Sequence, residues 1–212
     1  MFQSVEQREA VFSLDEARQC KTVHPASFYH ATTTHFVKRQ CQEGLVQSVS
    51  FPATSQKHAN MCTIVTGASS GFGYATTVGA LQRGDKVVAT LRTPSQLSEL
   101  GKKYDSKQLL ILKLDVTKQS EIESTFSEAK KHFGRIDVLF SNAGSNVVSE
   151  VEGTPEKKAR EIFDVLFWGA TNVTREAVKC FKEQKPIGGK VLQISSTVAV
   201  KDVPGVAYYS AA

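Results

Sequence analysis

The chain has 212 residues, of which 41% are hydrophobic and 22% are charged, a composition that predicts a folded globular protein and excludes a largely disordered one. No apolar stretch approaches the roughly 18 residues of a membrane-spanning helix, so we expect no membrane span. The net charge is +5, but basic and acidic residues are interleaved, which argues against a nucleic-acid partner. The four cysteines form no CxxC pair, so we expect free thiols and a cytoplasmic protein.

Residues 1–60 show neither helical nor strand periodicity and are predicted to be disordered or a non-native N-terminal extension. Their early acidic residues argue against a mitochondrial transit peptide. A zinc site is the alternative that their Cys and His content raises. We predict no metal here, because no structural zinc site has the spacing of the candidate ligands, which are Cys20, His24, His30, His35 and Cys41.

From residue 61 onward the pattern alternates between strands and helices, which is typical of a parallel sheet covered on both faces. The predicted strands are Thr63–Thr66, Lys86–Leu91, Leu109–Leu114, Ile136–Ser141 and Lys190–Ser195. The predicted helices are Gly73–Gln82, Ser95–Lys103, Ser120–His132 and Pro155–Glu183. Right-handed crossovers then give an α/β, doubly wound, Rossmann-like sheet of order 3-2-1-4-5 over residues 61–212, with a ligand crevice between strands 1 and 4.

The first predicted strand runs into a glycine-rich turn, TGASSGFG, and a helix follows directly. Backbone N–H groups and a helix N-terminus in this arrangement can hold the pyrophosphate of a dinucleotide. Gly67 allows the tight turn, Gly71 the approach of backbone to phosphate, and Gly73 the close packing of helix on strand. The alternative is an ordinary strand–turn–helix without a ligand. The remaining residues expected to contact the cofactor here are Ser69, Ser70 and Phe72.

The end of the second predicted strand indicates which dinucleotide is bound. An NAD enzyme needs a carboxylate there for the ribose 2′-hydroxyl, whereas the 2′-phosphate of NADP needs a cation and no carboxylate. The chain has Leu91 followed by Arg92, whose guanidinium can grip a phosphate with two hydrogen bonds. NADP(H) is therefore favoured over NAD(H). The alternative is a surface arginine lying over the strand edge.

Residues 61–212 resemble the short-chain dehydrogenase/reductase family, because four of its motifs occur in order and at the family's spacing. These are TGASSGFG, Asp115-Val116, Ser141-Asn142-Ala143-Gly144, and Ser196 followed 13 positions later by Tyr209. The segment FWGATNVTREAV from Phe167 to Val178 is similar to the hydroxysteroid or retinol dehydrogenase-like branch.

The resemblance implies hydride transfer between NADP(H) and a small-molecule carbonyl or alcohol. It implies that Tyr209 is the acid/base residue and that Ser196 hydrogen-bonds the substrate oxygen as charge develops. It also places Asp115, Val116, Asn142, Ala143 and Gly144 at the cofactor. The alternative for Tyr208-Tyr209 is a pair of interface aromatics.

Two features depart from the family pattern. The family has a lysine four positions after the tyrosine, which lowers the tyrosine pKa, whereas this sequence ends at Ala212, one residue short. Leu166 stands where the family has an asparagine that organises a proton-relay water. We therefore expect a C-terminally truncated, impaired enzyme; the alternative is a non-catalytic nucleotide-binding remnant or scaffold. A homo-oligomer through helix 155–183, weakened by truncation, is also expected.

Overall fold

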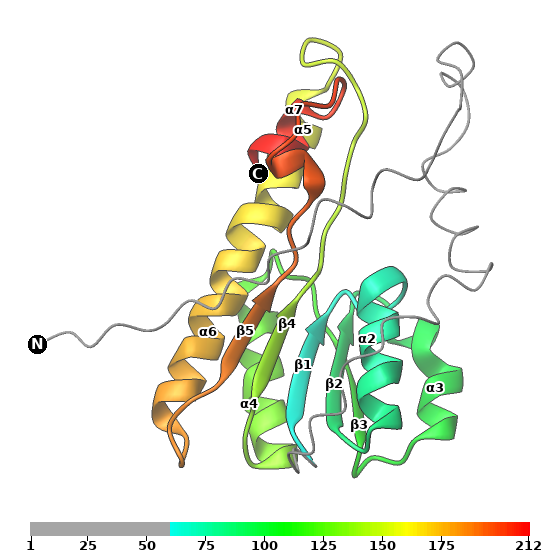
Figure 1. Cartoon of the computed structure of the whole chain (residues 1–212), viewed down its shortest axis with the longest axis vertical. Coiled ribbons are helices and arrows are strands. Elements are labelled where there is room, and N and C mark those ends of the chain that lie inside the picture. The colour runs from blue at the N-terminus through cyan, green and yellow to red at the C-terminus, as the bar shows by residue number, and fades with distance from the viewer. Residues whose placement is uncertain (1–59) are drawn as a thin grey trace, which may run out of the picture. The chain divides into compact units, whose positions relative to one another are not determined.

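The computed structural model describes residues 60–212. The expected N-terminal extension and its Cys and His residues lie outside the described part of the chain. Within residues 60–212, five strands alternate with helices along the chain, as Figure 1 shows. The strands are β1 (Cys62–Thr66), β2 (Lys86–Leu91), β3 (Leu109–Lys113), β4 (Val138–Ser141) and β5 (Lys190–Gln193).

All five strands are parallel and form one sheet of order β3-β2-β1-β4-β5, which confirms the predicted topology. β1 therefore pairs with β2 on one side and with β4 on the other, with Val65 opposite both Ala89 and Phe140. The chain order reverses at β1. In a sheet of this kind the reversal point leaves a crevice beyond the carboxyl ends of the strands.

The helices are α2 (Gly71–Gln82), α3 (Ser98–Lys103), α4 (Gln119–Phe133), α5 (Glu156–Phe163), α6 (Ala170–Glu183) and α7 (Ala207–Ala211). A 3-10 turn, Pro94–Leu97, leads into α3, so the predicted helix Ser95–Lys103 is α-helical only in its second part. Gly84 follows α2 and Gly134 follows α4, both at positive φ (84° and 83°), as expected for glycines that end helices.

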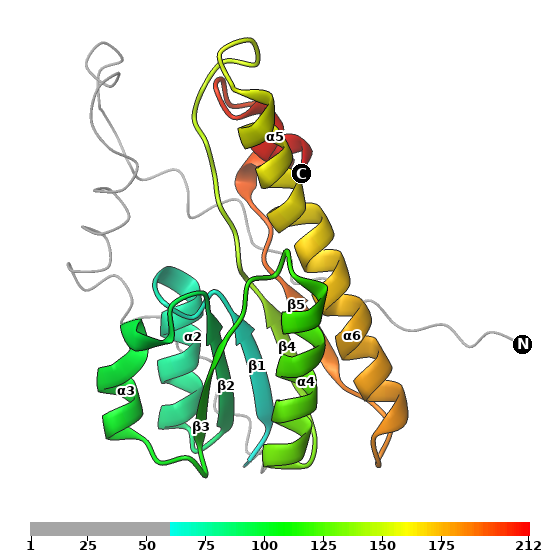
Figure 2. The ribbon, with the colours of Figure 1, turned by 180° about the vertical axis from the view of Figure 1, so that it is seen from behind.

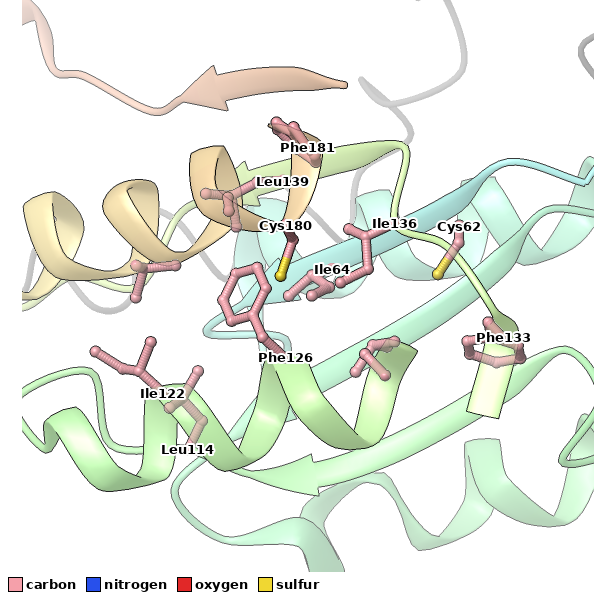
Figure 3. Close-up of a cluster of buried hydrophobic side chains, with 14 of the residues drawn as sticks. Cys62, Ile64, Leu114, Ile122, Phe126, Phe133, Ile136, Leu139, Cys180 and Phe181 are labelled. Carbon is pink, nitrogen blue, oxygen red and sulfur yellow. The ribbon is translucent and has the colours of Figure 1, made fainter. Parts of the chain in front are cut away.

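Two apolar cores lie on opposite faces of the sheet. α2 and α3 cover one face, and α4 and α6 cover the other (Figures 1 and 2). Figure 3 shows the second core, where Phe126 and Ile122 of α4 meet Ile64 of β1 and Leu139 of β4. Because β1 and β2 lie between both cores, nearly every residue in them is buried, which explains why their sequences do not alternate between polar and apolar residues.

The predicted single helix Pro155–Glu183 is more complex in the structure. α5 begins at Glu156, and Pro155 is the residue before its first turn. No side chain caps this helix; the Thr154 hydroxyl donates to the carbonyl of Glu150 (2.8 Å). A six-residue π-helical turn, Asp164–Gly169, then separates α5 from α6. The three segments run on as one long helix in Figure 2, with α7 beside α5.

The fourth strand begins two residues later than predicted, because the backbone of Ile136 is engaged elsewhere. Its N–H donates to the side-chain oxygen of Gln184 (3.1 Å), whose amide nitrogen donates back to the carbonyl of Ile136 (2.8 Å). These groups are thus paired with a side chain rather than with a neighbouring strand.

Among the residues that the structure describes, no helix is both long and apolar enough to cross a membrane.

Candidate functional site

The glycine-rich turn after β1 has the geometry of an anion-binding turn. Gly67 adopts a positive φ of 68°, and Ser70 precedes the first residue of α2, Gly71, without a side-chain cap. The first N–H groups of a helix have no acceptor inside the helix, so those of α2 are available to a ligand. Ser69, Ser70, Gly71 and Phe72 are all exposed, and 73% of Phe72 is accessible.

Gly73 is fixed by close packing between the helix and the turn. A Cβ atom at this position would overlap the carbonyl oxygen of Gly67 and lie 2.7 Å from the side-chain nitrogen of Asn142. A Cβ at Gly67 would lie 2.9 Å from the Cα of Ala143. The turn after β1 therefore packs directly against the segment after β4, and only glycines allow this approach.

Hydrogen bonds join the same two segments. The Thr66 hydroxyl accepts from the backbone N–H groups of Asn142 (2.9 Å) and Ala143 (3.0 Å). In return, the Asn142 side chain donates to the carbonyls of Thr66 (2.9 Å) and Gly67 (3.3 Å). Thr66 is 1% exposed. This four-bond connection, which we call the Thr66–Asn142 bridge, fixes the two sides of the crevice relative to each other.

A cleft of about 850 Å³ opens at this point, and its volume suits a dinucleotide-sized ligand. It is lined by the ends of β1, β2, β3 and β4 and by α5. Of the twelve residues predicted to contact a cofactor, all but Gly73 line it: Gly67, Ser69, Ser70, Gly71, Phe72, Arg92, Asp115, Val116, Asn142, Ala143 and Gly144. Gly73 lies behind the turn and acts through packing.

Arg92 places a positive charge on the wall of the cleft at the end of β2. Arg92 follows β2, is exposed, and forms no ion pair with a carboxylate within residues 60–212. The pKa of the Asp115 carboxyl lies below its ordinary value. Burial alone would raise it, but two hydrogen bonds from Thr117, together with the charges of Lys118 and Arg92, outweigh burial.

A second cavity of about 610 Å³ brings the two predicted catalytic residues together, since both Ser196 and Tyr209 line it. Ser196 precedes the 3-10 turn Thr197–Ala199, and its hydroxyl accepts from the N–H of Val198 (3.4 Å). Tyr209 belongs to α7 and is half-buried. Residues 142–144 line both this cavity and the 850 Å³ cleft, which we call the nucleotide cleft after the ligand that the sequence predicts, so the two share a wall.

The π-helical turn contributes to both cavities. Leu166 lines the cavity of Ser196 and Tyr209, and its Cδ2 atom would lie 3.2 Å from a Cβ at Gly144. Asp164 lines the nucleotide cleft instead. Asn172 lines neither; it borders a separate surface hollow formed by α6 and Gln119 of α4. The wall of the cavity of Ser196 and Tyr209 therefore has an apolar side chain at Leu166, the position where the resemblance described above implies an asparagine.

Several residues of the site were missed by the sequence analysis. Thr66 is one; it opens the TGASSGFG motif, but nothing in the sequence showed that its hydroxyl bonds the segment after β4. Lys158 and Glu161 of α5 also line the cleft and pair with each other (2.7 Å). Within residues 60–212, no group of three His, Cys, Asp or Glu side chains is placed to hold a metal ion.

The structure is similar to solved structures of one enzyme family. A short-chain dehydrogenase from Streptomyces avermitilis is 33% identical, with a TM-score of 0.67 over 72% of this chain and 55% of its own. A short-chain dehydrogenase/reductase from Mycobacterium marinum, 21% identical with a TM-score of 0.66 over 72% of this chain and 63% of its own, shares the fold.

Proteins similar in sequence include further oxidoreductases and dehydrogenases. An uncharacterized oxidoreductase of Schizosaccharomyces pombe is 35% identical over 148 residues, which are 70% of this chain and 49% of the relative. Oxidoreductase calM of Penicillium decumbens is 35% identical over 161 residues, 74% of this chain and 52% of the relative. The Arabidopsis thaliana 11-beta-hydroxysteroid dehydrogenase 1A is 27% identical over 170 residues, 78% of this chain and 48% of the relative. The chain thus spans about half the length of these curated relatives.

The family profile described as short chain dehydrogenase matches residues 61–212, which begin at β1 and include both cavities. This range contains every residue predicted to contact cofactor or substrate. With the strand order and the glycine turn described above, the match shows that the chain belongs to the short-chain dehydrogenase family.

Proposed function

We propose that the protein is an NADP(H)-dependent oxidoreductase that interconverts a carbonyl and an alcohol. The observation that carries this proposal is Arg92, an exposed guanidinium in the nucleotide cleft without a carboxylate partner among the described residues. Its predecessor Leu91 is 3% exposed and offers no acceptor for a ribose hydroxyl. A 2′-phosphate would supply the missing negative charge.

The residues of the cleft fit a dinucleotide. The uncapped N-terminus of α2 and the turn Gly67–Gly73 would hold the pyrophosphate, and Arg92 would hold the 2′-phosphate. Asp115 and Val116 would border the adenine, and residues 142–144 would lie toward the nicotinamide, since they also line the second cavity. When bound, the nicotinamide would supply or accept the hydride.

The proton chemistry belongs to the second cavity. In carbonyl reduction, the Tyr209 hydroxyl would donate its proton to the substrate oxygen as negative charge develops there. The Ser196 hydroxyl would donate a hydrogen bond to the same oxygen and so stabilise that charge. In alcohol oxidation the proton would return to Tyr209. Both residues share one cavity, which supports this division of roles.

The wider assignments are also proposals. Residues 61–212 would be the nucleotide-binding domain and residues 1–60 a separate extension of the chain. A cytoplasmic location is supported by Cys62 and Cys180, which are buried and unpaired. A homo-oligomer through helix 155–183 is supported by Phe167 and Trp168, an edge-to-face pair that is 46% and 55% exposed.

A second candidate is a non-catalytic nucleotide-binding protein or scaffold, and Leu166 is the observation that favours it. An apolar side chain in the cavity of Ser196 and Tyr209 cannot hydrogen-bond a water molecule that relays protons. Under this proposal the nucleotide cleft still binds NADP(H), but turnover is absent. Binding and turnover therefore distinguish the two candidates.

The proposal is tested by titrating NADPH and NADH against the wild type and Arg92→Leu. Losing charge-assisted bonds to the 2′-phosphate should weaken NADPH binding roughly 10- to 100-fold and leave NADH binding unchanged. Arg160→Leu is the matched control, because Arg160 is exposed, pairs with Glu156 and does not line the cleft. Equal affinities for both nucleotides, unchanged by Arg92→Leu, would contradict the NADP(H) assignment.

Turnover is measured as NADPH oxidation with a panel of ketones and aldehydes, for the 212-residue chain alone and extended by one lysine. Turnover that Tyr209→Phe abolishes supports the oxidoreductase. Nucleotide binding without turnover in either form supports the scaffold.

A further inference from the structure

Glu121 connects α4 to the loop that borders the nucleotide cleft. It is the third residue of α4, and its carboxylate reaches back past the start of the helix to the loop after β3. One oxygen, Oε2, accepts from the backbone N–H of Asp115 (2.7 Å). The other, Oε1, accepts from the Lys113 ammonium group (3.1 Å) and lies 3.8 Å from that of Lys118.

This contact differs from ordinary helix capping. A glutamate at the third helical position commonly bonds the N–H of the residue just before the helix. Here that residue is Lys118, whose N–H donates instead to the carbonyl of Asp115 (2.9 Å). The Glu121 carboxylate is therefore free to hold the loop three residues further back.

Both ends of the contact are anchored in the core. Ile122, next to Glu121, is fully buried, and Leu114, next to Asp115, is 3% exposed. Both belong to the same apolar core, where Figure 3 shows them close together. The backbone on either side of the bond is thus fixed, and the bond orients the loop together with the burial of Val116 and the bond from the Lys118 N–H to the Asp115 carbonyl.

The loop in question forms one wall of the nucleotide cleft. Asp115, Val116 and Thr117 all line the cleft, and the Asp115 carboxylate accepts from the Thr117 N–H (3.1 Å) and hydroxyl (2.8 Å). Glu121 itself does not line the cleft. It can therefore act on a bound nucleotide only by holding Asp115.

We infer that Glu121 is a positioning residue that holds the loop Asp115–Thr117 in the conformation that receives the adenine end of the nucleotide. This inference rests on the proposed nucleotide-binding function. The electrostatics agree with the geometry: the hydrogen bond from Asp115, opposed by burial and aided by Lys113 and Lys118, lowers the pKa of Glu121. The carboxylate is therefore ionised at neutral pH, when its hydrogen bond to the Asp115 N–H is strongest.

The test compares Glu121→Ala, Glu121→Gln and two controls in the 212-residue chain. Glu123→Ala removes a carboxylate of the same helix that, within residues 60–212, accepts a hydrogen bond from the exposed Gln119 side chain alone (2.9 Å). Lys113→Met removes the ion pair but keeps the bond to Asp115. Each variant is titrated with NADPH and with 2′,5′-ADP, and the exchange rate of the Asp115 amide hydrogen is measured by NMR without nucleotide.

We expect Glu121→Ala to bind both ligands about tenfold more weakly and to speed exchange of the Asp115 amide about tenfold or more. Glu121→Gln keeps an acceptor oxygen for the Asp115 N–H, so its nucleotide affinity and its Asp115 exchange rate should both stay close to those of the wild type. A general loss of stability in Glu121→Ala would not explain this difference between the two variants. Both controls should match the wild type within about twofold.

Two results would overturn the inference in distinguishable ways. A wild type that binds NADPH, beside a Glu121→Ala variant with the same affinity and the same Asp115 exchange rate, would refute the role of Glu121 alone. A wild type that binds neither NADPH, NADH nor 2′,5′-ADP would refute the proposed function and this inference with it.

Discussion

Two glycines of α2, six residues apart, should respond in opposite directions to the same substitution. In Gly73→Ala the new Cβ would overlap the Gly67 carbonyl oxygen and lie 2.9 Å from the carbonyl carbon, and neither backbone atom can move without opening the turn. Overpacking of this kind costs about 1–3 kcal/mol, and backbone neighbours place it near the upper end. Alanine's helix preference returns about 1 kcal/mol, so we expect a net loss of about 2 kcal/mol.

Gly79→Ala is the matched control. A Cβ at Gly79 would meet no atom within 4 Å, so only the helix preference changes. We expect this variant to gain about 0.5–1 kcal/mol in the free energy of unfolding. For a domain of this size, Gly73→Ala should melt about 4–8 °C below the wild type and Gly79→Ala about 1–4 °C above it.

The assay is thermal unfolding followed by circular dichroism, with NADPH titration of each folded variant. Gly73→Ala should also bind NADPH more weakly, because the turn that would hold the phosphates must shift, whereas Gly79→Ala should bind normally. The reasoning would be refuted if Gly73→Ala were as stable as the wild type and bound NADPH equally well. It would also be refuted if both substitutions changed stability in the same direction.

Two further predictions concern buried groups around β1. Thr66→Val should lower the free energy of unfolding by about 2 kcal/mol, because it leaves the N–H groups of Asn142 and Ala143 without their acceptor. Thr66→Ser keeps the hydroxyl and should cost less than half of that. Urea unfolding measures both losses, and equal losses would show that the methyl group matters rather than the hydroxyl. Burial, together with the Asp137 carboxylate, raises the pKa of the Cys62 thiol from its ordinary value of 9.0 to about 12. The folded chain therefore keeps this proton after the unfolded chain has lost it, so the stabilisation is complete below pH 9 and is lost as the pH rises from 9 toward 12, by up to about 1.4 kcal/mol per pH unit. Cys62→Ala should flatten this part of the pH dependence of unfolding, and an unchanged slope would contradict the prediction.

The order of strands and helices could be predicted from the sequence because each element carries a local signal. Buried strands such as β2 (Lys86–Leu91) are short and mostly apolar, and glycines such as Gly134 mark helix ends. The π-helical turn Asp164–Gly169 could not be predicted, because its residues have the same apolar spacing as an ordinary helix. Gly169 explains the close approach at its end: a Cβ there would lie 2.7 Å from Val116.

The candidate site likewise contains residues that the sequence predicted and residues that it did not. Residues that line the cleft were found because they belong to short motifs, such as the glycine turn. Thr66 belongs to the glycine-turn motif and Glu121 to no motif, and the roles of both were missed because each accepts from backbone N–H groups of another segment. Thr66 lies 76 positions before its partner Asn142, and no local pattern links the two. Glu121 also resembles any acidic residue in the first turn of a helix.

Under the proposed function, the shared wall of residues 142–144 makes nucleotide binding and turnover separable by mutation. The Thr66–Asn142 bridge fixes this wall to the glycine turn, so the wall's position is set by bonds on the nucleotide side. On its other side the wall meets Leu166, Ser196 and Tyr209, none of which takes part in the bridge. A change at Thr66 should therefore weaken nucleotide binding and turnover together, whereas a change at Leu166 should alter turnover and leave nucleotide binding intact. Leu166→Asn is consequently the substitution that best separates the oxidoreductase from the scaffold: it adds a polar group to the cavity of Ser196 and Tyr209, and Leu166 does not line the proposed nucleotide cleft.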